Sequence, residues 1–332
     1  MVDTHITNEY NTQLSKHQKT ISMSEKNDIC ATCGKGEEDK VNLKKCGACL
    51  SVKYCSAVCQ KAHRPLHKKA CKKRVAEMHD EQLFKVPPPP EDCPICFLRM
   101  PSMVSGFAYM QCCGKTICCG CVHSVQLRDI SPVCPFCRVP RHDATSDGYK
   151  EIIKQYKNRM EHNDAEAICA MAGFYDSGSY GFPQNVAKAL ELWHRAGELG
   201  SATSYNNIAV CYHSGRGVAR DKKKGVYYWE LAAMRGDPTS RNNLGSLELN
   251  KRRNEGRTGN VKKALMHYMI AARDGDTLSL KNIKNMYIDG YATKDDYAKA
   301  LRSYQAFVDE IRSDQRDEAA AIHDYRYYES AV

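Results

Sequence analysis

The chain has 332 residues, a formal net charge of +10 and 42% hydrophobic residues, an ordinary hydrophilic composition with room for two or three domains. It has no apolar run of about 18 residues, which argues against a membrane span, and no apolar signal core at its N-terminus, which argues against secretion. Of the 18 cysteines, 16 lie between residues 30 and 137. Without a secretion signal, this density favours zinc in a reducing compartment, so we expect an intracellular protein that is cytoplasmic, nuclear or both.

Two segments of different composition open the chain. Residues 1–27 are polar and have no periodic apolar positions, which predicts disorder. Residues 28–73 instead contain four successive pairs of metal-binding side chains, which are Cys30, Cys33, Cys46, Cys49, Cys55, Cys59, His67 and Cys71. These ligands suffice for two closed four-ligand zinc sites, and a module this small needs the metal for its folding energy.

The order and spacing of these ligands resemble the MYND finger, a protein-binding zinc module. In that family alternate pairs share a metal, which implies one site of Cys30, Cys33, Cys55 and Cys59 and another of Cys46, Cys49, His67 and Cys71. His63 lies one helical turn before His67 and is the rival imidazole, but the family's spacing favours His67. The family usually carries a Trp where this chain has Arg64, so one aromatic docking element is missing.

A basic block and a proline run come next. The block extends from Lys61 to Arg74 and could contact nucleic acid or act as a nuclear signal, although we favour a solvated face of the finger. Residues 74–92 continue the helix and end in four consecutive prolines. We expect an extended spacer there, with a ligand for another protein's aromatic groove as the alternative.

Residues 93–140 form the second cysteine-rich segment. Three Cys-x-x-Cys pairs and one vicinal pair stand in it, namely Cys93/Cys96, Cys112/Cys113, Cys118/Cys121 and Cys134/Cys137. A tight turn can direct two such thiolates at one zinc. The segment resembles a RING finger, the zinc module of many ubiquitin ligases, and the resemblance implies that the first and third pairs share one metal.

The second metal site of this finger departs from the family pattern. Cys113 takes the family's Cys position, but Lys115 takes its His position, and a protonated Lys cannot bind zinc. We expect Cys112 to complete the site with Cys113, Cys134 and Cys137, with His123 as the alternative and Cys119 after it. The two fingers together then predict four zinc ions, two in each.

The resemblance also implies a contact surface. RING ligases hold a ubiquitin-conjugating enzyme through an apolar residue inside the first pair, a Pro inside the last, and a basic residue after the final Cys. Here these are Ile95, Pro135 and Arg138, which would position the loaded enzyme and ubiquitin rather than act as nucleophiles. The alternative is that Ile95 and Pro135 only pack the finger and that Arg138 is a solvated charge.

The C-terminal half is helical and repetitive. Residues 141–163 are predicted to form an amphipathic connecting helix, and residues 164–311 contain four similar units near 164–200, 201–236, 237–275 and 276–311. Trp193, Trp229, Tyr268 and Tyr304 share one position of the unit, and Gly200, Gly236 and Gly275 end the first three. The pattern resembles the Sel-one-like repeat, a relative of the tetratricopeptide repeat that binds proteins or peptides. Residues 312–332 are predicted to be a C-terminal helix and tail.

The predicted fold is therefore two small zinc-stabilised cross-brace modules, of the MYND and RING types, followed by an all-α helical repeat solenoid. The first functional hypothesis is a ubiquitin ligase that binds a conjugating enzyme and ubiquitin through the RING, and recruits protein substrates through the repeats and the MYND finger. The second is a non-enzymatic adaptor or scaffold built from the same parts. Nucleic-acid binding by the basic block is a third, weaker hypothesis.

Overall fold

The structure is a computed structural model that describes residues 29–87, 89–102, 106–128, 133–142, 146–255 and 259–323. It divides into one compact unit up to Gln82 and another from Leu83 onward, and each is described by itself. The disorder predicted for residues 1–27 concerns a segment outside the described residues. Within the described residues, no helix is long and apolar enough to cross a membrane.

The first unit is a cysteine-rich knot followed by a long helix. It contains the short 3₁₀ turn η1 (Glu37–Asp39), the antiparallel strands β1 (Lys44–Lys45) and β2 (Lys53–Tyr54), and helix α2 (Ala57–Leu83). The buried residues of the knot are Cys30, Cys46, Cys49 and Tyr54. A core of three thiols and one ring is too small to fold the unit, so the metal must supply the rest.

The basic block lies on α2 and faces solvent. Lys61, Arg64, Lys68, Lys69, Lys72 and Lys73 are all exposed. Arg74 is the exception, because its guanidinium donates a hydrogen bond of 2.8 Å to Glu81 on the same helix. The block is thus an exposed helix face, which is compatible with both the solvated-face and the nucleic-acid interpretations.

The second unit begins with a segment that is anchored in the repeats. Leu83 and Phe84 are buried among apolar side chains that include Trp229, Leu244 and Ile270. Arg241, itself buried, donates a 2.8 Å hydrogen bond to the backbone carbonyl of Leu83. The end of the predicted helix extension is therefore packed against the solenoid, and only the residues after it can serve as a spacer.

The second finger is a hairpin followed by a helix. Strands β3 (Phe107–Met110) and β4 (Lys115–Cys118) pair antiparallel, with Phe107 opposite Cys118, and helix α3 (Cys119–Arg128) comes directly after them. Its core consists of the buried thiols together with Met100, Met110, Ile117 and Val122.

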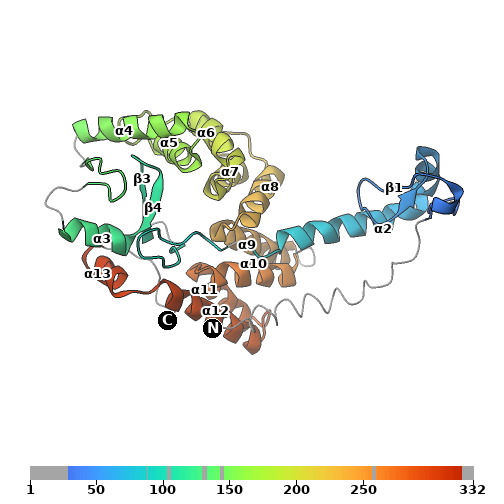
Figure 1. The fold of residues 1–332 in the computed structure, drawn as a ribbon. Coiled ribbons are helices and arrows are strands. Elements are labelled where there is room, and N and C mark those ends of the chain that lie inside the picture. The colour runs from blue at the N-terminus through green and yellow to red at the C-terminus, as the bar shows by residue number, and fades with distance from the viewer. Residues whose placement is uncertain are drawn as a thin grey trace. The chain divides into compact units, whose positions relative to one another are not determined.

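The repeats form helix pairs. Helix α4 (Ser146–Glu161) precedes them, and the pairs are α5 (Ala165–Ser177) with α6 (Val186–Glu198), α7 (Ala202–Ser214) with α8 (Lys222–Met234), α9 (Pro238–Glu255) with α10 (Val261–Arg273), and α11 (Thr277–Ile288) with α12 (Lys294–Ile311). Helix α13 (Asp314–His323) ends the described chain (Figure 1). The four aromatics that share one position of the unit are all at most 5% exposed, so this position lies in the core of each helix pair.

The glycines that end the first three units have positive φ, and they give a matched pair of variants. Gly200 (φ 113°) and Gly275 (φ 92°) both occupy backbone that an L-residue adopts with strain. A Cβ at Gly200 meets no atom within 4 Å, whereas one at Gly275 would meet ring atoms of Phe307 at 2.7 and 2.8 Å. The two sites therefore separate backbone strain from overpacking.

We expect Gly200→Ala to lower the local free energy of unfolding by about 1–2 kcal/mol, from the backbone alone. Gly275→Ala should cost about 1–3 kcal/mol more, because the buried Phe307 ring must move. Amide hydrogen exchange in the helices next to each glycine measures both costs. If the two substitutions lowered the free energy of unfolding equally, the Phe307 ring would move aside without a measurable cost.

Candidate metal centres

Among the residues that the structure describes, four groups of side chains could each hold a metal ion. They are Cys30, Cys33, Cys55 and Cys59; Cys46, Cys49, His67 and Cys71; Cys93, Cys96, Cys118 and Cys121; and Cys112, Cys113, Cys134 and Cys137. Within each group the potential ligand atoms all lie within 4.8 Å of one another. In chain order, both fingers join the first pair with the third and the second with the fourth, which is the interleaved cross-brace.

The distances between sulfurs match zinc rather than disulfides. Zn–S bonds of about 2.3 Å place two sulfurs of a tetrahedron about 3.8 Å apart. The Sγ–Sγ distances are 3.8 Å for Cys93 and Cys121, 3.7 Å for Cys96 and Cys118, and 3.6 Å for Cys113 and Cys134. Tetrahedral groups of thiolates with at most one imidazole are the donor set that structural zinc takes. Zinc is therefore the metal of these four sites.

Four of the Cys-x-x-Cys turns share one backbone conformation. The residue after the second Cys has positive φ in each, at Gly34 (74°), Leu50 (56°), Phe97 (58°) and Arg138 (61°). Its amide donates to the carbonyl of the first Cys, over 2.8 Å for Phe97 and 3.1 Å for Arg138. This bend turns both sulfurs of the pair toward one point. Of these four residues, only Gly34 makes the bend predictable from the sequence, since Leu, Phe and Arg rarely adopt a positive φ.

The two candidate imidazoles of the first finger have different partners. His67 Nε2 lies 3.2 Å from the sulfur of Cys49, inside the second group. His63 is turned away, with Nδ1 3.0 Å from the hydroxyl of Tyr54 and its ring stacked on His67. Arg64, in place of the family's Trp, is exposed. The structure thus brings His67, and not His63, to the thiols.

In the second finger Cys112 joins Cys113, Cys134 and Cys137, which is the arrangement expected for the site that lacks a His. His123 is buried on α3 and is not a member of the group. Cys119 packs in the core of the last repeats, beside residues such as Tyr268 and Phe307. Lys115 is exposed at the start of β4.

The thiols of these groups are shifted in opposite directions from their ordinary pKa. Hydrogen bonding from the Cys33 backbone lowers the pKa of Cys30 to about 5, whereas side-chain hydrogen bonds with Cys33 and Cys59 raise the pKa of Cys55 to about 12. Burial opposes ionisation of Cys134, but backbone hydrogen bonds from Cys137 and Phe136 outweigh it and lower that pKa to about 7. A cysteine must lose its proton to bind a dication, so metal affinity falls as the pH is lowered.

The turns of the second finger carry the residues matched to the RING contact surface. Ile95 is 37% exposed, Pro135 is half-buried, and Arg138 is exposed. The same two turns also expose Phe97 (77%) and Phe136 (36%), which the sequence pattern did not single out. An aromatic ring held out by a left-handed turn is a large apolar surface for a partner.

One side of this finger is attached to the start of the repeats. The Tyr109 hydroxyl donates a 2.7 Å hydrogen bond to Asp164, the N-cap residue of α5, and Arg159 donates to the same carboxylate over 2.6 and 2.9 Å. Burial would raise the pKa of Asp164, but the hydrogen bonds from Tyr109 and Arg159 outweigh it and the pKa is lowered.

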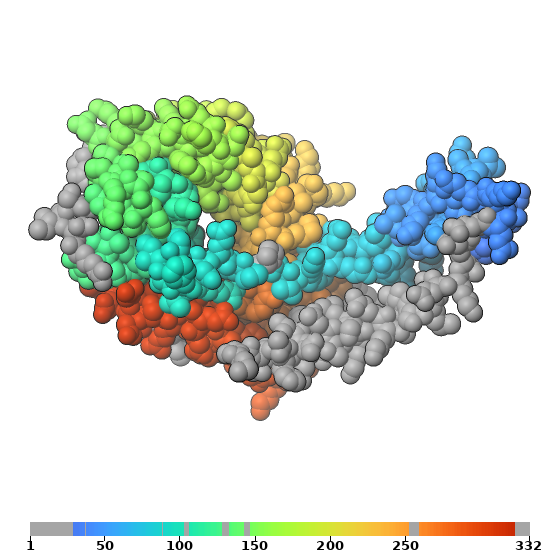
Figure 2. All heavy atoms as spheres, in the orientation of Figure 1, coloured from blue at the N-terminus to red at the C-terminus, as the bar shows by residue number. Residues whose placement is uncertain are grey.

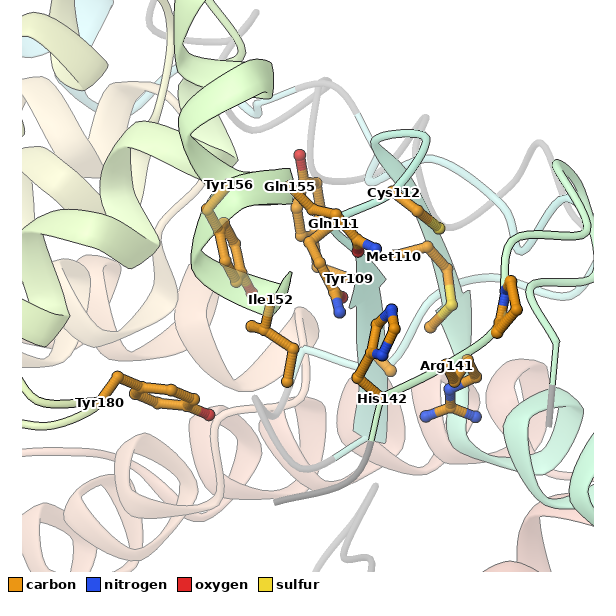
Figure 3. A pocket seen from close by; sticks show the side chains of 12 residues that line it. Tyr109, Met110, Gln111, Cys112, Arg141, His142, Ile152, Gln155, Tyr156 and Tyr180 are labelled. Atoms are coloured by element: carbon orange, nitrogen blue, oxygen red, sulfur yellow. The ribbon is translucent and has the colours of Figure 1, made fainter. Parts of the chain in front are cut away.

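A cavity of about 200 Å³ lies beside this attachment, between β3, residues 140–142 and α4. Figure 3 shows the rings of Tyr109 and Tyr156 side by side in its wall, with Arg141 and His142 opposite.

The other side of the finger is attached to the end of the repeats. Arg99 forms ion pairs with Glu310 (2.8 Å) and Asp274 (3.3 Å), and its guanidinium lies over the ring of Phe307. Helix α13 packs directly on α3 (Figure 1), and a Cβ at Gly120 would meet the backbone of Arg316 at 2.8 Å. The finger thus contacts both the start of the repeats, at Asp164, and helix α13 after their end (Figure 2).

Comparison with known families identifies two of the three parts. The MYND finger family matches residues 30–71, and the Sel1 repeat family matches residues 165–201 and 202–237. The chain therefore carries a MYND finger and Sel1 repeats, and both are protein-interaction modules. The third and fourth helix pairs continue the array with the same architecture.

Individual relatives match only in part. Chitin synthase regulatory factor 3 of Schizosaccharomyces pombe is 32% identical over 85 residues, which are 25% of this chain and 9% of that protein. The SET domain and MYND-type zinc finger protein 6 of the same organism is 39% identical over 59 residues, 18% of this chain and 12% of that one. A solved Sel1 repeat protein from Oxalobacter formigenes is 29% identical with a TM-score of 0.41, covering 48% of this chain and 64% of its own. The chain thus spans a small fraction of the length of these curated relatives.

Proposed function

We propose that the chain is a RING-type ubiquitin ligase whose second finger holds a ubiquitin-conjugating enzyme, while the Sel1 repeats and the MYND finger recruit protein substrate. The observation that carries the proposal is the interleaving of Cys93/Cys96 with Cys118/Cys121 and of Cys112/Cys113 with Cys134/Cys137. A cross-brace of this order supports two rigid turns that can present a shared surface to a partner.

The exposed side chains of those turns fit the proposed role. Ile95, Phe97 and Phe136 offer apolar area, and Arg138 offers a planar guanidinium that can hydrogen-bond two partners at once. The finger contributes no nucleophile. It acts by holding the thioester of the conjugating enzyme in a reactive pose, which is a gain from positioning.

Ubiquitin chain formation tests the proposal. Zinc-loaded full-length protein is incubated with activating enzyme, ubiquitin and a panel of conjugating enzymes, beside Ile95→Ala and Arg138→Ala. We expect each variant to lose about 10- to 100-fold in chain formation, the size of a hot-spot contact, while retaining the wild-type zinc content. Leu50→Ala is the matched control, because Leu50 is also an exposed apolar residue of a Cys-x-x-Cys turn, but in the other finger.

The second candidate function is a non-enzymatic adaptor, and Lys115 at the family's His position favours it. Protein that forms no chains with any conjugating enzyme, yet keeps about four zinc ions, would establish the adaptor and reject the ligase.

A further inference from the structure

The centre formed by Cys93, Cys96, Cys118 and Cys121 differs from the other three in its burial. Cys93, Cys118 and Cys121 are each at most 2% exposed, whereas the other two all-cysteine groups contain the exposed Cys33 and Cys137. The remaining group includes the neutral ligand His67. A zinc ion with four thiolates carries a double negative charge, and a buried charge is costly unless it is paired. This centre is therefore the one that most needs a cation beside it.

A fully buried arginine lies at this centre. Arg316, on α13, has 0% of its surface exposed, and its Nη2 is 3.8 Å from the sulfur of Cys96. Its Nη1 donates to the backbone carbonyls of Arg99 (3.0 Å) and Ile311 (2.5 Å). Within the described part of the chain, no carboxylate lies within ion-pair distance of this guanidinium. The thiolates are the anions that it meets.

We propose that Arg316 is the counter-ion of this zinc centre, so that α13 completes a finger whose ligands lie about 200 residues earlier in the sequence. Each group compensates the other, since the buried guanidinium lowers the cost of the thiolates and the thiolates lower the cost of the guanidinium. Zinc in the finger and the docking of α13 on α3 are then thermodynamically linked. The inference stands whether or not the chain is a ligase.

Release of zinc to a chelating dye from the full-length protein tests the inference. We expect Arg316→Gln to accelerate release from the second finger about 10- to 100-fold, as loss of an outer contact to a metal ligand does. Release from the MYND finger should stay at the wild-type rate. Arg316→Lys keeps the charge and should restore most of the wild-type rate. Amide exchange in the turn from Cys93 to Leu98 shows which finger has lost its metal.

Arg241→Gln is the control for a buried arginine as such. Arg241 lies on α9, is 1% exposed and also donates to two backbone carbonyls, those of Leu83 and Ala233. Its loss should leave zinc release unchanged. The proposal is overturned if Arg316→Gln releases zinc at the wild-type rate, if Arg241→Gln accelerates release equally, or if Arg316→Lys behaves as Arg316→Gln does.

Discussion

His67→Ala is expected to unfold the cysteine-rich knot of the first unit while the second unit stays folded. The knot has four buried residues and a pair of two-residue strands, so it has almost no stability without metal. Zinc binding supplies about 10–16 kcal/mol in finger peptides, which is far more than such a core can replace. Losing one ligand of an interleaved pair of sites therefore loosens both.

Metal analysis and hydrogen exchange measure the effect. We expect the variant to hold no more than about three zinc ions, where four are expected for the whole chain, and to lose amide protection before α2. His63→Ala is the matched control, since His63 is also an imidazole on α2 but hydrogen-bonds to Tyr54. A His67→Ala protein that keeps its zinc and its protection would show that this imidazole is not a ligand.

Asp164→Ala is expected to detach the second finger from the start of the repeats. The carboxylate caps α5 by accepting from the amides of Glu166 and Ala167, and it also accepts from Tyr109 and Arg159. Its removal loses the cap and leaves a half-buried guanidinium without its anion. Together these two losses should lower the free energy of unfolding by about 2–4 kcal/mol. This is less than the full penalty for breaking a buried ion pair, because Arg159 is partly exposed.

Asp221→Ala isolates the capping contribution. Asp221 caps α8 by accepting from the amides of Lys223 and Lys224, and within the described residues no side chain is seen to donate to it. We expect a cost of about 1 kcal/mol there. Hydrogen exchange in α5 and β3, compared with α8, gives the two costs. If they were equal, the contact between Tyr109 and Asp164 would contribute nothing to holding the finger.

The parts of this structure that the sequence predicted are those set by short-range spacing. A short spacing brings the two ligands of a pair together whatever surrounds it. The alternate matching of the pairs is what the MYND and RING resemblances imply, and with it the four ligand groups follow. The repeat aromatics, such as Trp193 and Tyr268, recur at a fixed interval and identify the buried face of each helix pair. Cys112 was expected in its group because a neighbouring thiolate can replace a missing imidazole.

The parts that escaped prediction depend on contacts between distant segments. Arg316 lies in a polar tail, and its sequence neighbours do not identify the thiolates 220 residues earlier as its partners. A weak signal was available, because Arg316, Ala319 and Ala320 share one helix face and small residues allow close packing. Asp164 likewise reads as an ordinary helix cap, and only the fold shows that Tyr109 reaches it.

The contact between α3 and α13 also sets an order of events during translation. At about 5–20 residues per second, the roughly 180 residues between Cys137 and Arg316 take about 10–40 s to synthesise. For that interval the nascent finger can bind zinc, but the face of α3 that carries Cys119 and Gly120 has no partner helix. A ribosome that stalls in the repeats leaves this face open, so a truncated chain differs from a finished one by an exposed apolar surface that chaperones and proteases can recognise.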